Sequence, residues 1–178
     1  KIQKALISVS NKKNLKHLLN TLSKYKIEII SSGGTYKKIR ELGFKCVQLS
    51  KFTDAPEILN GRVKTLHPKI YGGILNKRQN KKHYREIKKN NYENIDLIIV
   101  NFYPFEDTVS KKTNHNNIIE NIDIGGPTMV RAAAKNYNDV VVICNPNQYE
   151  ALIKEIETNK GSTNLSFREK LAEQAFME

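Results

Sequence analysis

The strongest constraint on the fold is a series of short, continuous runs of apolar and mostly β-branched residues. Five runs occur, at residues 5–9, 27–30, 46–49, 97–100 and 140–144, and the third is the weakest. A run that is apolar at every position, rather than at every second one, is typical of a parallel strand buried on both faces. We therefore expect a mostly parallel sheet that is covered on both sides.

Stretches with helical periodicity separate these runs. They span residues 14–24, 35–42, 82–89, 127–135, 147–157 and 166–177. In the first, Leu15, Leu18, Leu19 and Leu22 share one face, as in a helix packed on a core. Gly43 ends the second, and Pro127 stands in the first turn of the fourth. Alternation of strands and helices predicts an α/β fold, a three-layer sandwich with a mostly parallel sheet.

Two segments depart from this alternation. Residues 53–74 hold two prolines and three glycines among basic residues, and their regularly spaced apolar residues favour a functional loop over a disordered one. Residues 108–117 are polar and rich in Lys and Asn, which makes them the best candidate for a mobile loop.

The formal net charge of +12 admits two interpretations, a nucleic-acid-binding surface or a solvated surface rich in lysine. The lysines are spread along the chain and no nucleic-acid-binding motif accompanies them. We therefore expect no specific nucleic-acid partner, only a field that attracts anionic metabolites. No run of eighteen apolar residues is present, so we expect no membrane-spanning helix.

The two cysteines, Cys46 and Cys144, both lie in apolar runs predicted to be strands. This placement favours small core residues over a disulfide framework or a metal site. Such cysteine usage is typical of a reducing cytoplasm.

Polar residues follow the predicted strands at the sheet edge where ligands bind in parallel α/β folds. Ser32, Gly34 and Thr35 stand between a strand and a helix, in a pattern suited to an anion. An ordinary capped turn accounts for that pattern equally well. Ser10 and Lys12, after the first strand, offer a hydroxyl and a cation for the same anion, or simply a capped helix start with an exposed lysine.

A basic segment inside the irregular region also carries candidate chemistry. Arg62 and Lys64 would share one side of an extended segment, and with Thr65 and His67 they would hold an anionic ligand or transfer protons. The alternative is a solvated basic loop in which His67 acts as a structural brace.

A carboxylate stands just before a Gly-Gly turn that leads into the fourth helix. Asp123 would stabilise a developing charge or move a proton, and Lys135 closes the same helix. The alternative is a helix cap followed by a surface lysine. About nine helical residues between the two would separate them by ~14 Å along the axis, so Lys135 reaches the same centre only if the helix starts later, bends or lies across the pocket.

Four motifs occur together in order: SSGGTYKKI, PEILNGRVKTLHPKIYGGIL, DLIIVNFYPF and IENIDIGGPTMVRAAAKN. From about Ala5 to the last residue, the chain resembles the N-terminal domain of the enzyme family that joins AICAR transformylase and IMP cyclohydrolase. The resemblance implies a methylglyoxal-synthase-like fold over residues 1–146. It also implies that the helices of residues 147–178 lead toward a transformylase domain that the sequence does not contain.

The activity implied by the resemblance is loss of water from formyl-AICAR to give IMP, in the cytoplasm and without cofactor or metal. The resemblance also implies a homodimer for the full-length enzyme. The implied catalytic residues are Lys64, Tyr103, Asp123 and Lys135. The implied nucleotide-binding residues are Ser10, Lys12, Ser32, Gly34, Thr35, Arg62 and Thr65.

The chain departs from the family pattern at Asn11, Tyr71 and Phe102, where Asp, often His, and Leu are usual. None of these is an implied site residue. Two alternatives share the expected fold. One is methylglyoxal synthase, whose acidic and histidine motifs are not apparent here. The other is a phosphate-binding regulatory module, like the allosteric domain of carbamoyl phosphate synthetase, which needs a phosphate pocket but no Lys–Tyr–Asp–Lys set.

Overall fold

A five-stranded parallel sheet forms the centre of the computed structural model, which describes residues 1–102 and 114–177. The strand order is β3-β2-β1-β4-β5, and each neighbouring pair runs parallel. The strands are β1 (Lys4–Val9), β2 (Glu28–Ser31), β3 (Val47–Gln48), β4 (Leu97–Asn101) and β5 (Val141–Ile143). The predicted parallel sheet is confirmed.

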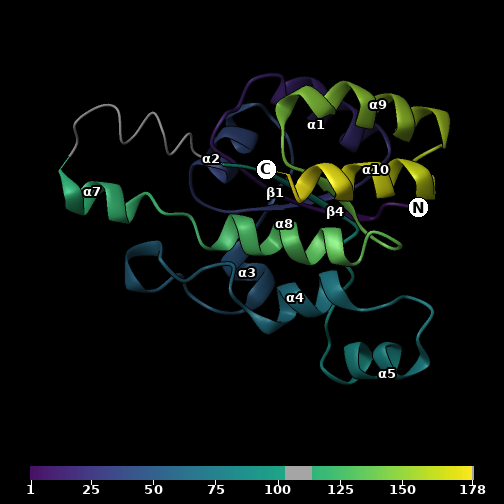
Figure 1. Ribbon diagram of the computed structural model, residues 1–178, viewed down its shortest axis with the longest axis horizontal. Helices are drawn as coiled ribbons and strands as arrows, with labels where there is room; N and C mark the ends of the chain where they lie inside the picture. The colour runs from purple at the N-terminus through teal and green to yellow at the C-terminus, as the bar shows by residue number, and fades with distance from the viewer. Residues whose placement is uncertain (103–113, 178) are drawn as a thin grey trace.

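Helices cover both faces of the sheet (Figure 1). On one side lie α1 (Leu15–Lys24) and α9 (Tyr149–Thr158), which contact each other. On the other lie α3 (Leu49–Thr53), α4 (Pro68–Leu75) and α8 (Gly125–Lys135). The last helix, α10 (Leu165–Ala175), packs against α8 and β5, whereas α2 (Gly33–Glu41) contacts β1 and β2. This is the three-layer sandwich that the sequence predicted.

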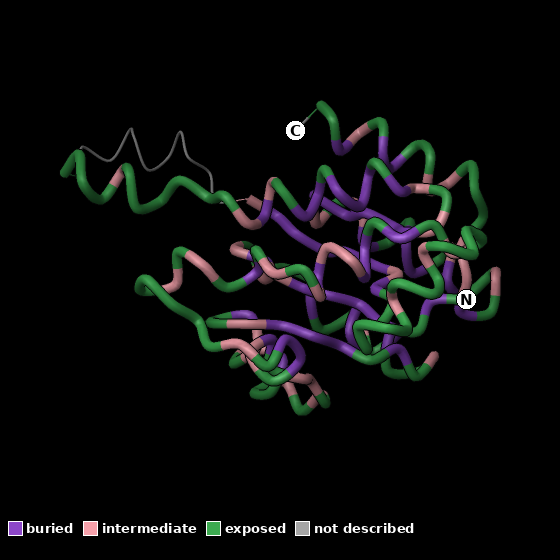
Figure 2. The backbone as a smooth tube through the Cα atoms, turned by 90° about the horizontal axis from the view of Figure 1, so that it is seen from below, coloured by how far each residue is buried: buried purple, intermediate pink, exposed green. Residues whose placement is uncertain are grey.

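Burial follows the apolar runs of the sequence. All five residues of β4 are buried, and the tube in Figure 2 is buried along the central strands. The four leucines of α1 are each at most 1% exposed. Burying one such side chain contributes roughly 1.5–3 kcal/mol. The helix α5 (Lys81–Lys89), predicted from residues 82–89, has no buried residue.

The segment predicted to be irregular, residues 53–74, contains the start of helix α4. Pro68 occupies the first turn, and the N–H of Lys69 donates to Nδ1 of His67 at 3.1 Å, which caps the helix. Gly72 and Gly73 lie inside this helix because it packs closely on its neighbours. A Cβ at Gly73 would lie 2.5 Å from the carbonyl oxygen of Glu93. These glycines permit close packing rather than forming a loop.

Other boundaries differ by a few residues from the predictions. Helices α2 and α8 begin at Gly33 and Gly125, two residues earlier than expected, and the third strand contains only two residues because Leu49 starts α3. A short helix, α7 (His115–Glu120), lies partly within the predicted mobile loop of residues 108–117. Its cap is Asn114, whose side chain accepts from the N–H of Asn116. Residues 108–113 of that loop lie outside the described part of the chain.

Cys46 adjoins β3 and Cys144 follows β5, so they lie at opposite edges of the sheet and form no disulfide. None of the helices in the described residues is both long and apolar enough to cross a membrane.

Candidate active site

A pocket of about 590 Å³ opens at the carboxyl ends of β1, β2 and β4. The chain leaves β1 toward β2 on one side and later returns to form β4 on the other. Such a switch in strand order is where ligands bind in open α/β sheets. The pocket-lining residues include nine of the eleven sequence-predicted site residues: Ser10, Lys12, Ser32, Gly34, Thr35, Arg62, Lys64, Thr65 and Asp123.

The loop after β1 is fastened to the sheet by Asn101, the last residue of β4. Its Oδ1 accepts hydrogen bonds from the N–H groups of Ser10 and Asn11, at 2.7 and 2.9 Å, and from the Ser10 hydroxyl at 2.9 Å. Its Nδ2 donates to the carbonyl of Asn11 at 3.0 Å. Asn101 was not among the predicted site residues. A polar residue that ends an otherwise apolar strand was the signal that could have found it.

The N-terminus of α2 faces the pocket. By helix geometry, the N–H groups of Gly33, Gly34 and Thr35 have no partner within α2, and together they favour an anion. A Cβ at Gly34 would meet no atom within 4 Å, so this glycine leaves open space toward the pocket. Gly33 has a φ of +54°, a conformation that L side chains rarely adopt.

The Thr35 hydroxyl forms its hydrogen bonds within the protein rather than toward the pocket. It accepts from the N–H of Val9 at 3.1 Å and donates to the carbonyl of Val9 at 3.0 Å, which ties α2 to the end of β1. The Ser10 hydroxyl likewise points to Asn101 Oδ1 and to the carbonyl of Phe102. Ser32, in contrast, makes no side-chain bond to the helix that it caps. Of these three predicted donors, the Ser32 hydroxyl is therefore the one open to a ligand.

Lys12 provides a positive charge beside this group. Its Nζ lies 3.4 and 3.3 Å from the carbonyl oxygens of Val9 and Ser10. It makes no ion pair with any carboxylate in the described residues. The ammonium group therefore keeps its charge unpaired at the pocket, as an anionic ligand requires.

The opposite side of the pocket is built by the loop before α4. Leu59, Asn60 and Gly61 have successive positive φ values of 54°, 54° and 87°, so the chain turns sharply there. This turn precedes Arg62 and Lys64, both of which are exposed at the pocket. Thr65 is buried, and a Cβ at Gly125 would lie 2.2 Å from its Oγ1. The glycine thus lets this loop touch the start of α8.

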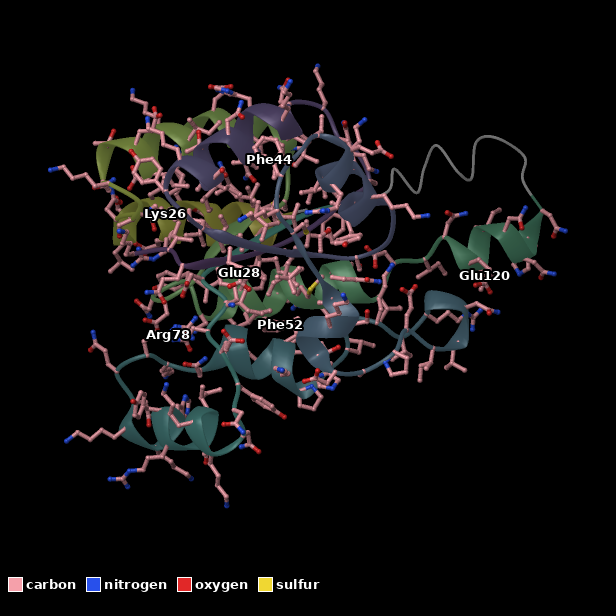
Figure 3. The ribbon with its side chains drawn as sticks, turned by 180° about the vertical axis from the view of Figure 1, so that it is seen from behind. Lys26, Glu28, Phe44, Phe52, Arg78 and Glu120 are labelled. Carbon is pink, nitrogen blue, oxygen red and sulfur yellow. The ribbon has the colours of Figure 1, made fainter. Side chains whose placement is uncertain are left out.

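Arg62 forms a two-point ion pair with Glu120 of α7. Figure 3 shows Glu120 on the side of α7 that faces this loop. The pair raises the pKa of the Arg62 guanidinium and lowers the pKa of the Glu120 carboxyl. Glu120 also lines the pocket and was not predicted from the sequence, because nothing near it in the chain indicates that it meets Arg62.

Asp123 lies just before α8. Its Oδ1 accepts from the N–H of Gly126 at 3.0 Å, and a Cβ at Gly126 would lie 2.3 Å from Oδ2. Gly126 is therefore required for this close approach. Asp123 thus lies at the N-terminus of α8, where the helix dipole presents its positive end.

Tyr71 of α4 lies near this carboxylate. Burial raises the pKa of its phenol to about 12, and the negative charge of Asp123 adds to the increase. The phenol thus stays neutral beside the site.

The structure does not bring Lys135 to the pocket. Lys135 is exposed at the last position of α8, whereas Gly125 at the first position lines the pocket. Ten steps along the helix separate them by roughly 15 Å. Tyr103, the remaining predicted catalytic residue, lies outside the described residues. No group of three or more His, Cys, Asp or Glu side chains suited to a metal ion occurs in the described part of the chain.

Comparisons with known proteins agree with this architecture. A family model described as an MGS-like domain matches residues 14–128, and one described as the AICARFT/IMPCHase bienzyme matches residues 133–178. The chain belongs to the MGS-like domain family. A solved structure, "Crystal structure of ForH", superposes on this MGS-like chain with a TM-score of 0.86 and 30% identity, covering 99% of this chain and 93% of the other.

Curated relatives of this MGS-like chain are bifunctional purine biosynthesis proteins PurH. The protein from Acetivibrio thermocellus is 48% identical over 98% of this chain and 34% of its own length. The protein from Prochlorococcus marinus strain MIT 9211 is 51% identical over 97% of this chain and 33% of its own length. The chain therefore spans about a third of the length of these relatives.

Proposed function

We propose that this chain is an IMP cyclohydrolase, which closes the second ring of the purine base by removing water from formyl-AICAR. The observation that carries the proposal is the pocket, whose lining includes the N-terminus of α2, Lys12, Lys64 and Asp123. The relatives support it, because proteins named for purine biosynthesis match nearly the whole chain at about half identity.

The phosphate of the nucleotide would bind at the start of α2. The N–H groups of Gly34 and Thr35, the Ser32 hydroxyl and the Lys12 ammonium are the donors proposed for it. Arg62 and Thr65 would hold the nucleotide from the opposite loop. In this proposal the hydroxyls of Ser10 and Thr35 act by fixing the shape of the site, because both are bonded within the protein.

The reacting end of the substrate would lie between Lys64 and Asp123. The carboxamide nitrogen forms a bond to the formyl carbon and gives up a proton, for which Asp123 is the proposed acceptor. The formyl oxygen gains negative charge, which the Lys64 ammonium would stabilise, and it would take up the proton held by Asp123. The C–O bond then breaks and the oxygen leaves as water with a second proton, which comes from the formamide N–H as its nitrogen forms the new C=N bond. No electrons are exchanged and no group carrier takes part, so the proposed reaction uses no cofactor.

Two of the predicted catalytic residues, Tyr103 and Lys135, are not among the described residues that line the pocket. Tyr103 remains a predicted member of the reacting group, although it lies outside the described residues. Lys135 remains a prediction that this geometry does not support, because it lies at the far end of α8 from the pocket.

We also propose that the intact protein is a cytoplasmic homodimer. Absence of a disulfide at Cys46 and Cys144 supports the compartment. Exposed apolar side chains at Leu59 and Ile124, 65% and 56% exposed, support an interface between copies. Light scattering on the full-length protein tests the dimer, and a monomer at micromolar concentration would contradict it.

The test of function is to incubate the chain with formyl-AICAR, follow the ultraviolet absorbance and identify IMP by chromatography. We expect IMP to form at a rate proportional to protein concentration. A folded chain that binds the nucleotide without forming IMP would instead indicate the alternative, a phosphate-binding regulatory module of the same fold.

A further inference from the structure

Helix α8 begins with two consecutive glycines, Gly125 and Gly126, and each lies against a residue of the proposed site. A Cβ atom at Gly125 would come within 3.0 Å of Thr65 Oγ1, and one at Gly126 would come within 3.0 Å of Asp123 Oδ2. Real Cβ atoms essentially never approach other heavy atoms so closely. The positions of Thr65 and Asp123 therefore require glycine at both places.

Backbone conformation does not account for this pair. Neither glycine has a positive φ, in contrast to Gly33 and Gly61, and both belong to the regular helix α8. Alanine favours a helix more than glycine does. The atoms that take the place of the two missing side chains are thus the reason for glycine at positions 125 and 126.

The space beside Gly126 is filled by the carboxylate of Asp123. Oδ1 accepts from the N–H of Gly126 at 3.0 Å, and Oδ2 lies where a methyl group at position 126 would project. The next nearest atoms to that methyl group are Asp123 Cγ and Val100 Cγ1, both at 3.1 Å. Asp123 is exposed, so its carboxylate can turn aside while the chain stays folded. An added methyl group would therefore displace the proposed proton acceptor without unfolding the protein.

The space beside Gly125 is filled by Thr65, the residue that follows Lys64. Thr65 is 4% exposed, and its carbonyl accepts from the N–H of His67 at 2.9 Å, just before α4. A side chain in a close-packed interior has no free space to turn into. A methyl group at position 125 would therefore push the loop that carries Lys64 away from the start of α8.

We propose that the Gly125–Gly126 pair positions the two reacting groups of the site, with Gly126 fixing the Asp123 carboxylate and Gly125 fixing the loop that carries Lys64. The proposal rests on the proposed function, in which these two groups act on the same substrate. The glycines set the spacing between the proton acceptor and the ammonium group, and they leave the phosphate site at the start of α2 unaffected.

The first test is Gly126→Ala, with Arg131→Ala as the control. Arg131 is an exposed residue of the same helix and does not line the pocket. We expect Gly126→Ala to lower kcat by about tenfold to a hundredfold, because displacing a reacting group by about 1 Å can have that effect. The Kd for IMP and for inorganic phosphate should stay within about twofold, since the phosphate binds elsewhere. The control should keep the wild-type values.

Two further measurements separate this role from a purely structural one. In an Asp123→Asn background, the added Gly126→Ala change should not lower kcat further, because the group that it displaces is already lost. The amide of residue 126, after correction for residue type, should exchange its hydrogen several-fold faster in Gly126→Ala than in the wild type, because its bond to Asp123 Oδ1 is broken.

Gly125→Ala tests the second glycine. It should lower both kcat and the melting temperature, because the buried Thr65 has to move. In a Thr65→Ala background, where room for the methyl group is restored, Gly125→Ala should cause no further fall in melting temperature. An equal fall in both backgrounds would overturn the role of Gly125.

Unchanged kcat in a folded Gly126→Ala variant of an active wild type would overturn the inference, as would a further loss in the Asp123→Asn background. A Kd for phosphate that rises as kcat falls would also contradict it. A wild type that forms no IMP would reject the proposed activity. In that case faster exchange at residue 126 would retain the role of Gly126 in holding the carboxylate, and unchanged exchange would reject that role as well.

Discussion

The two sides of the pocket are held in place by different kinds of contact. On the strand side, Thr35 and Asn101 are buried and bond to backbone groups of β1 and the loop that follows it. On the loop side, Arg62 and Glu120 are 60% and 57% exposed at their side chains and are joined by an ion pair at the surface. Buried hydrogen bonds fix one geometry, whereas an exposed ion pair is weak and easily exchanged for a ligand.

This difference suggests that the two sides of the pocket have different functions. The strand side presents preformed donors for an anion, and the loop side carries Lys64 and Asp123, the groups proposed for the reaction. Changes at Lys64 and Asp123 should therefore lower turnover, changes on the strand side should lower stability or affinity, and a change at the exposed ion pair should have a small effect. The following predictions test that division.

The largest effect is expected for Asp123→Asn. Removing the proposed proton acceptor should lower kcat by about 10²-fold or more, while nucleotide affinity changes little because the phosphate binds on the strand side. Steady-state kinetics and calorimetric titration with IMP measure the two quantities. Asp54→Asn, a change to an exposed carboxylate outside the pocket, is the control and should behave as wild type. Full turnover in a folded Asp123→Asn variant would place the reaction elsewhere.

Lys64→Met should lower kcat at least tenfold, because the ammonium that stabilises the formyl oxygen is lost. The matched change, Lys135→Met, should leave kcat within about twofold in this chain, since Lys135 lies at the other end of α8. Steady-state kinetics measured in parallel on the two variants compare their kcat values with that of the wild type. Equal losses in both would mean that Lys135 reaches the substrate and that the pocket described here is incomplete.

Thr35→Val should destabilise the fold because the Val9 N–H loses its hydroxyl partner and the Val9 carbonyl keeps only the long contact with the Lys12 Nζ, at 3.4 Å. The free energy of unfolding should fall by about 2 kcal/mol or more, as expected when buried polar groups lose their partners. Urea denaturation measures this, with Ser32→Ala as the control because that hydroxyl makes no cap bond. A Thr35→Val chain as stable as wild type would show that the strand side is less fixed than described.

The smallest effect is expected for Glu120→Gln. The free energy of unfolding should not change measurably, because exposed ion pairs contribute little. The affinity for IMP should rise by less than about fivefold, since the carboxylate no longer competes for Arg62, and the gain should shrink at high salt. Calorimetric titrations at two salt concentrations measure this. Weaker binding would instead mean that Glu120 orients Arg62 for the ligand.

The sequence predicted the parallel sheet correctly, but it did not predict helix α4. Strand β4 is apolar at four successive positions, a pattern that predicts burial on both faces of the sheet. Residues 68–74 were predicted to be irregular because glycine and proline are more common in loops than in helices. Glycine stands at positions 72 and 73 of this helix because Tyr92 and Glu93 pack closely against it. The local sequence does not reveal that packing.

For the site, the sequence indicated which residues would lie together at the pocket. The structure showed which of their side-chain atoms are free of hydrogen bonds within the protein and can contact a ligand. Nine predicted residues line one pocket. The sequence did not predict that the Ser10 and Thr35 hydroxyls form hydrogen bonds within the protein. Their partners lie on other strands or helices, and the Ser10 hydroxyl meets Asn101 across 91 residues of chain.

By itself, the sequence determined the elements of this protein, because the periodicity of apolar residues and the conformations of Gly and Pro act over a few neighbouring positions. It also determined which polar groups end each strand. The tertiary structure alone decided that β1 lies between β2 and β4, that Glu120 meets Arg62 and that Lys135 is remote from Asp123. These relations depend on how distant segments pack, and no local pattern encodes a contact between residues that only the folded chain brings together.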